Sequence, residues 1–287
     1  MFPESLTFSI AKPVNRAVDW LVIEYGDAFE SLSNALLTVL IGLEQGMNAL
    51  PWWGLIGVVA AIAFAASRDW KLPLFTSLLL LLLGMLGLWQ QGIQTLALML
   101  VATGLSVVIG IPIGIAMASS DRLRLFLQPL LDIMQTMPSF VYLIPALMLF
   151  GLGKVPAIFA TIIYAVPPLI RLTDLGIRMV DKEVMEASRA FGANRWQQLW
   201  GVQLPLALPN ILAGINQTTM MALSMVVIAS MIGARGLGEQ VLLGIQRLDV
   251  GKGLEAGIGI VLLAILFDRI TQAYGQRRQL REQGGKA

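Results

Sequence analysis

The sequence predicts an all-α, polytopic membrane protein with about seven transmembrane helices and an N-terminal amphipathic helix. Three observations predict this fold class. The chain of 287 residues is 56% hydrophobic and only 13% charged, whereas soluble domains carry about 25% charged residues. Seven apolar segments approach the roughly 17–25 residues that cross a bilayer as a helix. Lys and Arg gather in alternate connections between those segments, as they do in membrane proteins with a fixed orientation.

The seven expected spans form a single integral membrane domain over residues 51–273. Trp52 and Trp53 open the first span and Trp89 closes the second, which fits the preference of indole rings for the membrane interface. The expected spans are 52–67, 72–89, 92–118, 130–150, 155–177, 207–232 and 255–273.

Proline residues interrupt several of these segments. Each one removes a backbone hydrogen bond that lipid cannot replace, so such breaks survive where other helices or a watery cavity satisfy the freed groups. A single break is most simply a static kink. A dense cluster favours a protein that moves, because transporters use discontinuous helices. The interrupting residues are Pro112, Pro138, Pro145, Pro167, Pro168 and Pro209.

The distribution of basic residues predicts the orientation of the chain. One set of connections, which includes the long segment 178–206 and the C-terminal tail 274–287, holds 14 of the 20 Lys and Arg residues, and the opposite set holds 6. The side with the excess is expected to be cytoplasmic. The N-terminus is then outside and the C-terminus inside, and an odd number of spans requires this opposition.

Residues 1–50 are expected to form an extracytoplasmic tail followed by an amphipathic helix. Between residues 28 and 50, apolar side chains recur at helical spacing, while Asn34 and Glu44 belong to a polar face. Such a helix lies in the membrane interface or against the bundle. The alternative is an eighth span, which would place Asn34 and Glu44 at membrane depth at a high energetic cost. At the other end, residues 274–287 are expected to form a short, basic cytoplasmic tail.

The residue types that are missing exclude several classes of function. The chain has no Cys and no His, which excludes disulfides, thiol chemistry and most zinc or haem sites, so no metal site and no catalytic residue are expected. It also lacks the phosphate-binding pattern G-x-x-x-x-G-K-[ST]. The net charge of +2 is too small to indicate a nucleic-acid partner. An integral membrane enzyme is therefore disfavoured.

The connection 178–206 is expected to fold as a helical knob, a name used here for residues 181–200. The pattern predicts a helix over Asp181–Phe191 with an acidic first turn, ended by Gly192, and a second short helix over Asn194–Trp200. A compact pair of helices can dock into the groove of a soluble partner, with an apolar side formed by Val184, Ala187 and Phe191. The alternative is an ordinary interfacial loop.

The same connection carries a sequence signature. Glu186-Ala187-Ser188, then Gly192, then Val202-Gln203-Leu204-Pro205 resembles the "EAA" signature of the permease subunits of ABC importers, with Ser188 and Val202 as mild departures. The resemblance implies a type I ABC importer (MetI-like) transmembrane domain in the bacterial inner membrane. It implies a homodimer of permeases, two ATPase subunits that hold ATP and Mg, and an extracytoplasmic binding protein, with no cofactor on this chain. The residues implied to couple it to the ATPase are Glu186, Ala187, Ser188, Gly192, Leu204 and Pro205.

Three further stretches resemble a narrower group. Residues 134–160, 232–241 and 248–270 look like permeases for glycine betaine, proline betaine, choline and related quaternary ammonium osmoprotectants. A permease for another small solute, such as an amino acid, is the nearest alternative. An ion-coupled secondary transporter, with intramembrane carboxylates for coupling, is an alternative from a different class.

Polar and aromatic residues inside the spans are candidates for the substrate path. They would line a transient cavity or, equally well, join helices by hydrogen bonds and packing. These candidates are Gln135, Thr136, Phe140, Tyr142, Asn216, Gln217 and Thr218. Among charged residues, Arg171 is expected to be able to pair with Asp174 one turn later, and Asp132 and Asp268 are expected near the inner ends of their spans.

Overall fold

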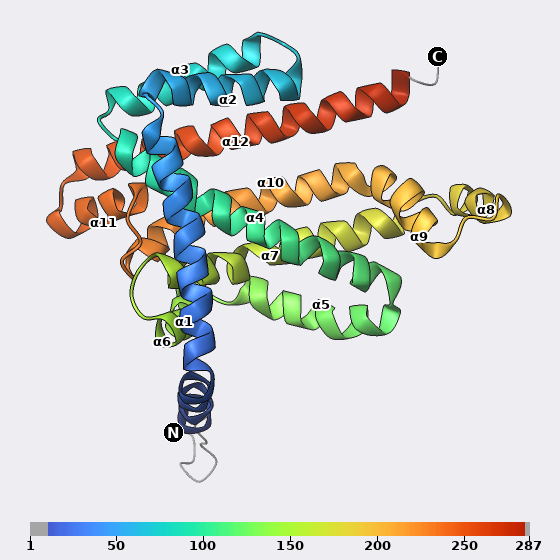
Figure 1. The fold of residues 1–287 in the computed structure, drawn as a ribbon, viewed down its shortest axis with the longest axis horizontal. Helices are drawn as coiled ribbons and strands as arrows, with labels where there is room; N and C mark the ends of the chain where they lie inside the picture. Colours follow the sequence, from blue (N-terminus) through green and yellow to red (C-terminus); the bar gives the residue numbers. More distant parts are fainter. Residues whose placement is uncertain (1–10, 285–287) are drawn as a thin grey trace, which may run out of the picture.

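The computed structural model describes residues 11–284, which are folded into helices joined by short connections with no strand among them (Figure 1). The helices are α1 (Ala11–Ala49), α2 (Trp52–Ser67), α3 (Lys71–Met85), α4 (Trp89–Ser119), α5 (Asp121–Thr136), α6 (Leu143–Phe150), α7 (Lys154–Arg178), α8 (Lys182–Ala190), α9 (Arg195–Gln198), α10 (Leu204–Ser230), α11 (Leu237–Arg247) and α12 (Val250–Gly284), with a 3-10 turn at Ser139–Tyr142 and a π-turn at Leu199–Gln203.

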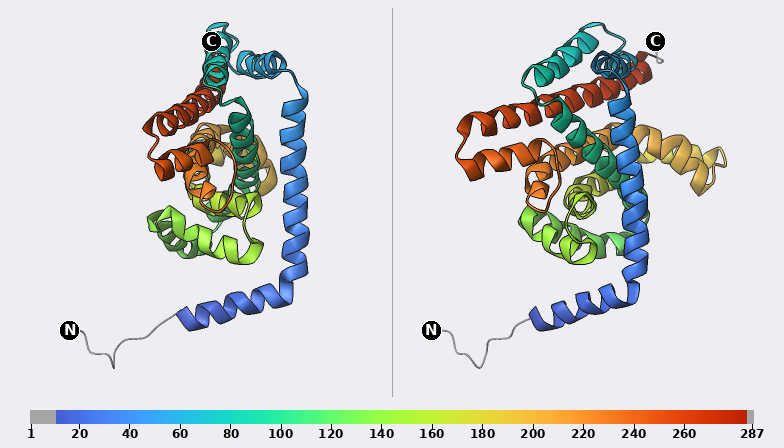
Figure 2. Two further views of the ribbon diagram at one scale, coloured as in Figure 1. Left: turned by 90° about the vertical axis from the view of Figure 1, so that its left-hand side faces the viewer. Right: turned by 60° about the vertical axis from the view of Figure 1, so that its left-hand side comes forward.

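Most of the long helices share one direction, and α1 crosses them. Helices α2, α3, α4, α5, α7, α10 and α12 run roughly parallel or antiparallel to one another, whereas α1 lies across the bundle (Figures 1 and 2). α1 bends at Tyr25, whose φ of −117° and ψ of 15° are not helical. The all-α architecture of the prediction is confirmed.

Fewer helices than the seven expected are long and apolar enough to span a membrane. Four helices in the described part of the chain are long and apolar enough, and up to six spans result if each of two bent pairs counts as one. α2 and α3 are only 16 and 15 residues long, below the usual length of a full span. The remaining difference comes from the segment predicted at 130–150.

The expected span 130–150 is not a continuous helix. α5 ends at Thr136, and the chain turns by 109° before the 3-10 turn and α6 continue it. Met137 has extended backbone angles, as a residue before proline should. The sequence indicated a break at Pro138 but not its size. As a result, α6 turns sideways from α5 instead of extending its axis (Figure 1).

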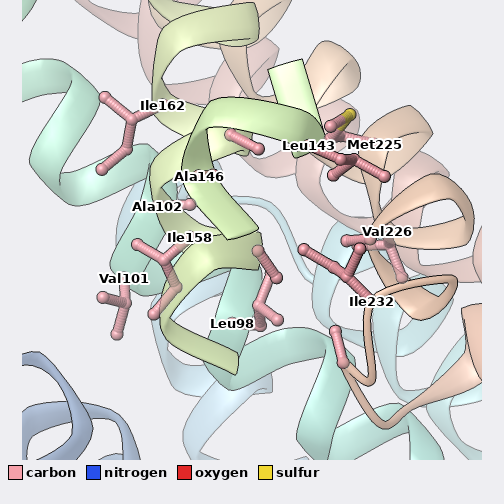
Figure 3. Close-up of a cluster of buried hydrophobic side chains, with 14 of the residues drawn as sticks. Leu98, Val101, Ala102, Leu143, Ala146, Ile158, Ile162, Met225, Val226 and Ile232 are labelled. Atoms are coloured by element: carbon pink, nitrogen blue, oxygen red, sulfur yellow. The ribbon is translucent and has the colours of Figure 1, made fainter. Parts of the chain in front are cut away.

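The centre of the bundle is formed by α7, which lies between α4 and α10 and is the most deeply buried of the long helices. Glycines allow the close approach of α4. A Cβ atom added at Gly114 would lie 2.5 Å from the Cβ of Thr173 on α7. Figure 3 shows where α4, α6, α7 and α10 meet in one buried apolar cluster. The cluster includes Leu98, Val101, Ala102, Leu143, Ala146, Ile158, Ile162, Met225, Val226 and Ile232.

α1 packs against this cluster through one side only. Leu36 and Leu40 are buried, whereas Val39 is 58% exposed, as the amphipathic pattern predicts. One residue of the polar face, Glu44, does not face solvent. Glu44 turns inward and pairs with Lys154, with oxygen-to-nitrogen distances of 2.6 and 2.8 Å. A partner 110 residues away therefore satisfies a carboxylate that the sequence had assigned to the solvent side.

The C-terminal end of the chain differs from its expected description. α12 continues to Gly284, so the expected tail 274–287 begins as an uninterrupted continuation of the last helix. Residues 285–287 of that tail, and residues 1–10 of the expected N-terminal tail, lie outside the described residues.

Candidate coupling surface and membrane path

The knob begins with a well-capped helix. The side chain of Asp181 accepts a hydrogen bond from the N–H of Glu183 at 2.9 Å at the start of α8. At its end Gly192 has a φ of +78°, and the N–H of Ala193 donates to the carbonyl of Ser188 at 3.1 Å. This is the hydrogen bond that closes a helix with a left-handed glycine. The predicted helix and its glycine end are confirmed.

The second helix of the knob is fixed by a reciprocal cap. The N–H of Gln197 donates to the side chain of Asn194 at 2.9 Å, and the N–H of Asn194 donates to the side chain of Gln197 at 2.8 Å. Asn at the cap and Gln three residues later form a capping box, a signal that the sequence contained. The π-turn Leu199–Gln203 then joins α9 directly to α10. The knob is thus continuous with a long helix of the bundle.

The knob presents large apolar side chains to its surroundings. α8 and α9 project beyond the ends of α4 and α7 (Figure 1). Phe191 is 93% exposed, Trp196 70% and Trp200 65%. Val184 is also exposed, on the same helix face as Ala187. A concentration of exposed apolar side chains on one projection is typical of a surface that binds another protein.

The six signature residues take two different positions. Glu186 and Ala187 are exposed on α8, and Gly192 is exposed at its end. Ser188 contributes its carbonyl to the helix end. Pro205 is exposed in the first turn of α10, whereas Leu204 packs into the apolar cluster beneath the knob. The first part of the signature therefore forms the outer surface, and Leu204 attaches that surface to the bundle.

A cluster of charges lies beneath the knob at the end of α7. Asp174 is only 3% exposed and accepts a hydrogen bond from the Nε of Arg178 at 2.8 Å. The Nε of Arg124 on α5 lies 3.3 Å from the other oxygen of Asp174. Arg178 also donates to Asp121 at 2.6 Å and to the carbonyl of Met117 at 2.9 Å. One arginine thus ties the ends of α4, α5 and α7 together.

The expected pairing of Arg171 with Asp174 is wrong. Arg171 instead donates to Asp132 on α5. The i, i+3 spacing permitted the local pair, but Asp174 faces the packed ends of α4 and α5, where Arg124 and Arg178 meet it. Arg178 stands four residues after Asp174, so the correct pair was available as an i, i+4 signal.

The candidates near the break of α5 divide into exposed and buried residues. Gln135 and Thr136 are exposed at the end of α5, and Phe140 is 58% exposed in the 3-10 turn. Tyr142 is 5% exposed, and its hydroxyl donates to the carbonyl of Met134 at 2.5 Å. Tyr142 therefore holds the 3-10 turn against α5, while Phe140 is free to meet a ligand or a neighbouring chain.

The polar turn of α10 points in three directions, because successive residues of an α-helix are about 100° apart. Asn216 faces α12, where its Nδ2 donates to Asp268 at 2.9 Å. Gln217 is exposed. Thr218 is fully buried, and its hydroxyl donates to the carbonyl of Ala165 on α7 at 2.9 Å. Asn216 and Thr218 therefore each join α10 to a neighbouring helix, and Gln217 lies on an open face.

The open face of α10 has an unusual composition for contact with lipid. Its exposed residues are Leu206, Ala213, Gln217 and Ser224, spaced so that they form one stripe along the helix. Helices α11 and α12 lie on one side of α10 and α5 and α6 on the other, with α1 on the far side of the bundle (Figure 2, left). Small and polar side chains on a membrane helix are typical of an interface between helices or of a watery path.

Residues 110–279, which include the knob, α7, α10 and most of α12, match the family described as "Binding-protein-dependent transport system inner membrane component". The chain belongs to this family. The match covers the segment in which the EAA-like signature lies, and the family assignment confirms the expectation that the chain is the membrane subunit of an importer. Its role is transport rather than catalysis.

Individual relatives extend the similarity over nearly the whole chain. The glycine betaine/proline betaine transport system permease protein ProW of Escherichia coli (strain K12) is 48% identical over 95% of this chain and 76% of its own length. The glycine betaine transport system permease protein OpuAB of Bacillus subtilis (strain 168) is 45% identical over 92% of this chain and 93% of its own. GbuB of Listeria monocytogenes, a glycine betaine/carnitine transport permease protein, is 43% identical over 96% and 98%.

A solved structure supports the fold. The MetNI methionine ABC transporter, in inward-facing conformations, matches with a TM-score of 0.55 and 25% sequence identity over 65% of this chain and 92% of the matched chain. The family member described here therefore has the transmembrane architecture of a type I ABC importer, as expected.

Proposed function

We propose that this permease moves glycine betaine, choline or a related quaternary ammonium osmoprotectant into the cell. One observation carries the substrate class: three relatives whose names include glycine betaine are 43–48% identical to this chain over at least 92% of its length. The MetNI methionine ABC transporter, at 25% identity, gives weaker support to an amino acid. Family membership also argues against an ion-coupled secondary transporter.

The knob is proposed to be the site of coupling to an ATPase. Glu186, Ala187 and Gly192 would contact a groove of the ATPase, and the exposed rings of Phe191 and Trp196 would be covered there. ATP and Mg would be held by that partner. Because α9 continues through the π-turn into α10, a displacement of the knob would tilt α10 directly. The charge cluster at Asp174 would transmit the same displacement to α4 and α5.

The orientation follows from this role. The knob and the C-terminal part of α12 would be cytoplasmic, in agreement with the excess of Lys and Arg in those connections. α1 packs against the opposite ends of α4 and α7, where Leu40 meets Leu98 and Ile158. It would therefore lie at the outer face of the bacterial inner membrane, where an extracytoplasmic binding protein would deliver the solute.

The substrate path is proposed to lie between two copies of this chain. The stripe containing Gln217 and Ser224 and the exposed residues Gln135, Thr136 and Phe140 would line it. Tyr142 and Thr218 would support this lining from behind. ATP binding would close two ATPase subunits, draw the knobs together and open the path outward, and hydrolysis would restore the inward-facing state. The difference in free energy between the states would come from the nucleotide.

The dimer has a direct test, because the chain contains no cysteine. Ser224→Cys places one thiol on the open stripe of α10, and Leu74→Cys places one on α3, where Leu74 is 75% exposed at the other side of the bundle. We expect oxidation to join two Ser224→Cys chains in membranes and to leave Leu74→Cys monomeric. The reverse pattern would contradict the proposed interface.

The function is tested by reconstitution. Vesicles that contain this permease with its ATPase should take up radiolabelled glycine betaine when ATP is inside and loaded binding protein is outside. Glu186→Lys should abolish uptake, whereas Glu255→Lys, a matched change at an exposed residue of α12 far from the knob, should retain it. Uptake that persists without ATP and follows an ion gradient would contradict the proposal, as would normal uptake by Glu186→Lys.

A further inference from the structure

Asp268 lies on α12 opposite the middle of α10. It accepts a hydrogen bond from Asn216, which lies 12 residues after the first residue of α10 and 14 before its last. The sequence places Asp268 near the inner end of the last span, and the apolar part of α12, Val250–Gly275, ends at Gly275. An ionisable residue within a membrane-spanning helix is rare and is generally connected with function.

The ion pairs of the described side chains do not include Asp268. Its partners are two carboxamides, which donate to the same oxygen: Asn216 at 2.9 Å and Gln272 at 2.7 Å. Arg269, the next residue, is exposed and lines, with Lys71, a neighbouring cavity between α12 and α3 whose wall also includes Gln272. The hydrogen bonds described for Asp268 therefore come from amide dipoles.

The two amides form part of the wall of a cavity of about 250 Å³ between α10 and α12. The wall consists of Pro209, Leu212, Ala213, Asn216, Thr271, Gln272 and Gly275. Drug-sized ligands occupy pockets of about 300–1,000 Å³, so this cavity suits a smaller solute. Ala213 also belongs to the open stripe of α10, which places the cavity beside the proposed path.

The polarity of the wall favours a cation. Because Asn216 directs its NH2 group to Asp268, its carbonyl oxygen is turned away from the carboxylate. This oxygen has no hydrogen-bond partner in the described part of the chain and lies just beneath the cavity surface, so a solute would meet it only after the side chain moves. No Lys or Arg stands among the lining residues. Methyl and methylene groups of Pro209, Leu212 and Ala213 complete the wall, and these match the methyl groups of a quaternary ammonium.

We propose that this cavity is a transient binding site for the quaternary ammonium group of the transported solute, with Asp268 as the counter-charge behind the amides of Asn216 and Gln272. The inference rests on the proposed function and adds a location to it. Asp268 orients the two amides and supplies long-range attraction, Gln272 contacts the ligand at the exposed side of the cavity, and Asn216 supports the wall between the ligand and Asp268. Because the carboxylate of Asp268 does not touch the solute, its attraction for the ammonium group is weak. Weak binding suits a transport path, since the solute must leave it again.

Binding is tested on the permease–ATPase complex in lipid nanodiscs without the binding protein. The probes are choline and its uncharged isostere 3,3-dimethyl-1-butanol, followed by saturation-transfer NMR and calorimetry. We expect choline to bind at least about tenfold more tightly than the isostere, and Asp268→Asn to remove most of this difference, because one charge a few ångströms away contributes on that scale. Glu255→Gln, which removes an exposed charge from the same helix, should bind choline like the wild type.

A second variant protects the test against misfolding. Gln272 is exposed, so Gln272→Met should fold even if Asp268→Asn does not, and it should weaken choline binding several-fold. Unchanged choline binding in the folded variants would overturn the inference, as would a response to Na⁺ with none to choline. If the wild-type importer takes up no quaternary ammonium compound, the proposed function fails. If the wild type does take up such compounds and Asp268→Asn binds and transports them equally well, the proposed function stands and only the proposed binding site is refuted.

Discussion

Glu44 and Lys154 form a two-oxygen ion pair that joins α1 to the first residue of α7. Their side chains are only 13% and 20% exposed, so each charge depends on the other for solvation. The pair is the polar part of an otherwise apolar contact between α1 and the central cluster. It adds a polar contact to the apolar side chains that hold the crossing helix against the bundle.

Removing one member of this pair should loosen α1. Glu44→Gln leaves Lys154 partly buried without a counter-charge, and we expect a loss of roughly 1–3 kcal/mol in the free energy of unfolding, between the values for exposed and buried pairs. The double variant Glu44→Gln/Lys154→Met should recover most of it. Thermal unfolding in detergent measures both. Lys252→Met, at an exposed pair 4.0 Å apart, is the control and should change little.

The charge cluster beneath the knob offers a comparison between two aspartates. Asp174→Asn leaves Arg124 and Arg178 without their shared carboxylate at a site that is 3% exposed, and should cost about 3 kcal/mol or more. Asp121→Asn removes a carboxylate that also bonds Arg178 but is 85% exposed, and should cost less than about 1 kcal/mol. Thermal denaturation of the purified variants ranks them. Equal losses would contradict the assigned roles.

Two glycines of α4 should respond in opposite ways to alanine. At Gly114 a Cβ atom would lie 2.5 Å from the Cβ of Thr173 and 2.9 Å from the carbonyl oxygen of Ile170, so Gly114→Ala should separate α4 from α7 and destabilise the protein by roughly 1–3 kcal/mol. At Gly104 no atom lies within 4 Å. Gly104→Ala should therefore be neutral or stabilising by up to about 1 kcal/mol. Unfolding midpoints of the pair check this sign difference.

The left-handed backbone of Gly192 makes it sensitive to substitution without any steric clash. A Cβ atom there would meet nothing within 4 Å, so Gly192→Val acts through backbone strain of about 1–2 kcal/mol. We expect it to displace α8 and to lower coupled uptake strongly while the bundle stays folded. Gly192→Asn, which tolerates this conformation better, should retain more activity. Uptake and ATP hydrolysis measured together in vesicles would reveal whether the two have been uncoupled.

Local features were predictable from the sequence, and pairings between distant elements were not. The ends of α8 follow from Asp181 and Gly192, whose effects are confined to one turn. By contrast, Arg171 pairs with Asp132 because of the way α5 packs against α7, which involves residues far apart in the sequence. The Glu44–Lys154 pair requires the fold of 110 intervening residues. The break at Pro138 was readable as a position, but its angle of 109° is set by the packing of α6.

The candidate sites followed the same rule. The signature of the knob is contiguous, so the sequence indicates Glu186, Ala187 and Gly192 directly as coupling candidates. Among the path candidates, Gln217 and Thr218 are neighbours with opposite surroundings, one exposed and one buried. Nothing in the polar turn distinguished them before α7 and α12 were in place. Likewise, the sequence placed Asp268 near the inner end of the last span but could not indicate its pairing with Asn216 of α10.

The π-turn at Leu199–Gln203 sets the rotation of the preceding helices α8 and α9 about the axis of α10. A π-turn contains one residue more than a turn of α-helix, and one residue corresponds to about 100° of rotation about the axis. Trp196 and the rest of the knob therefore point in a different direction from the one a regular helix would give them. A single inserted residue thus sets the direction in which the exposed apolar side chains of the knob face.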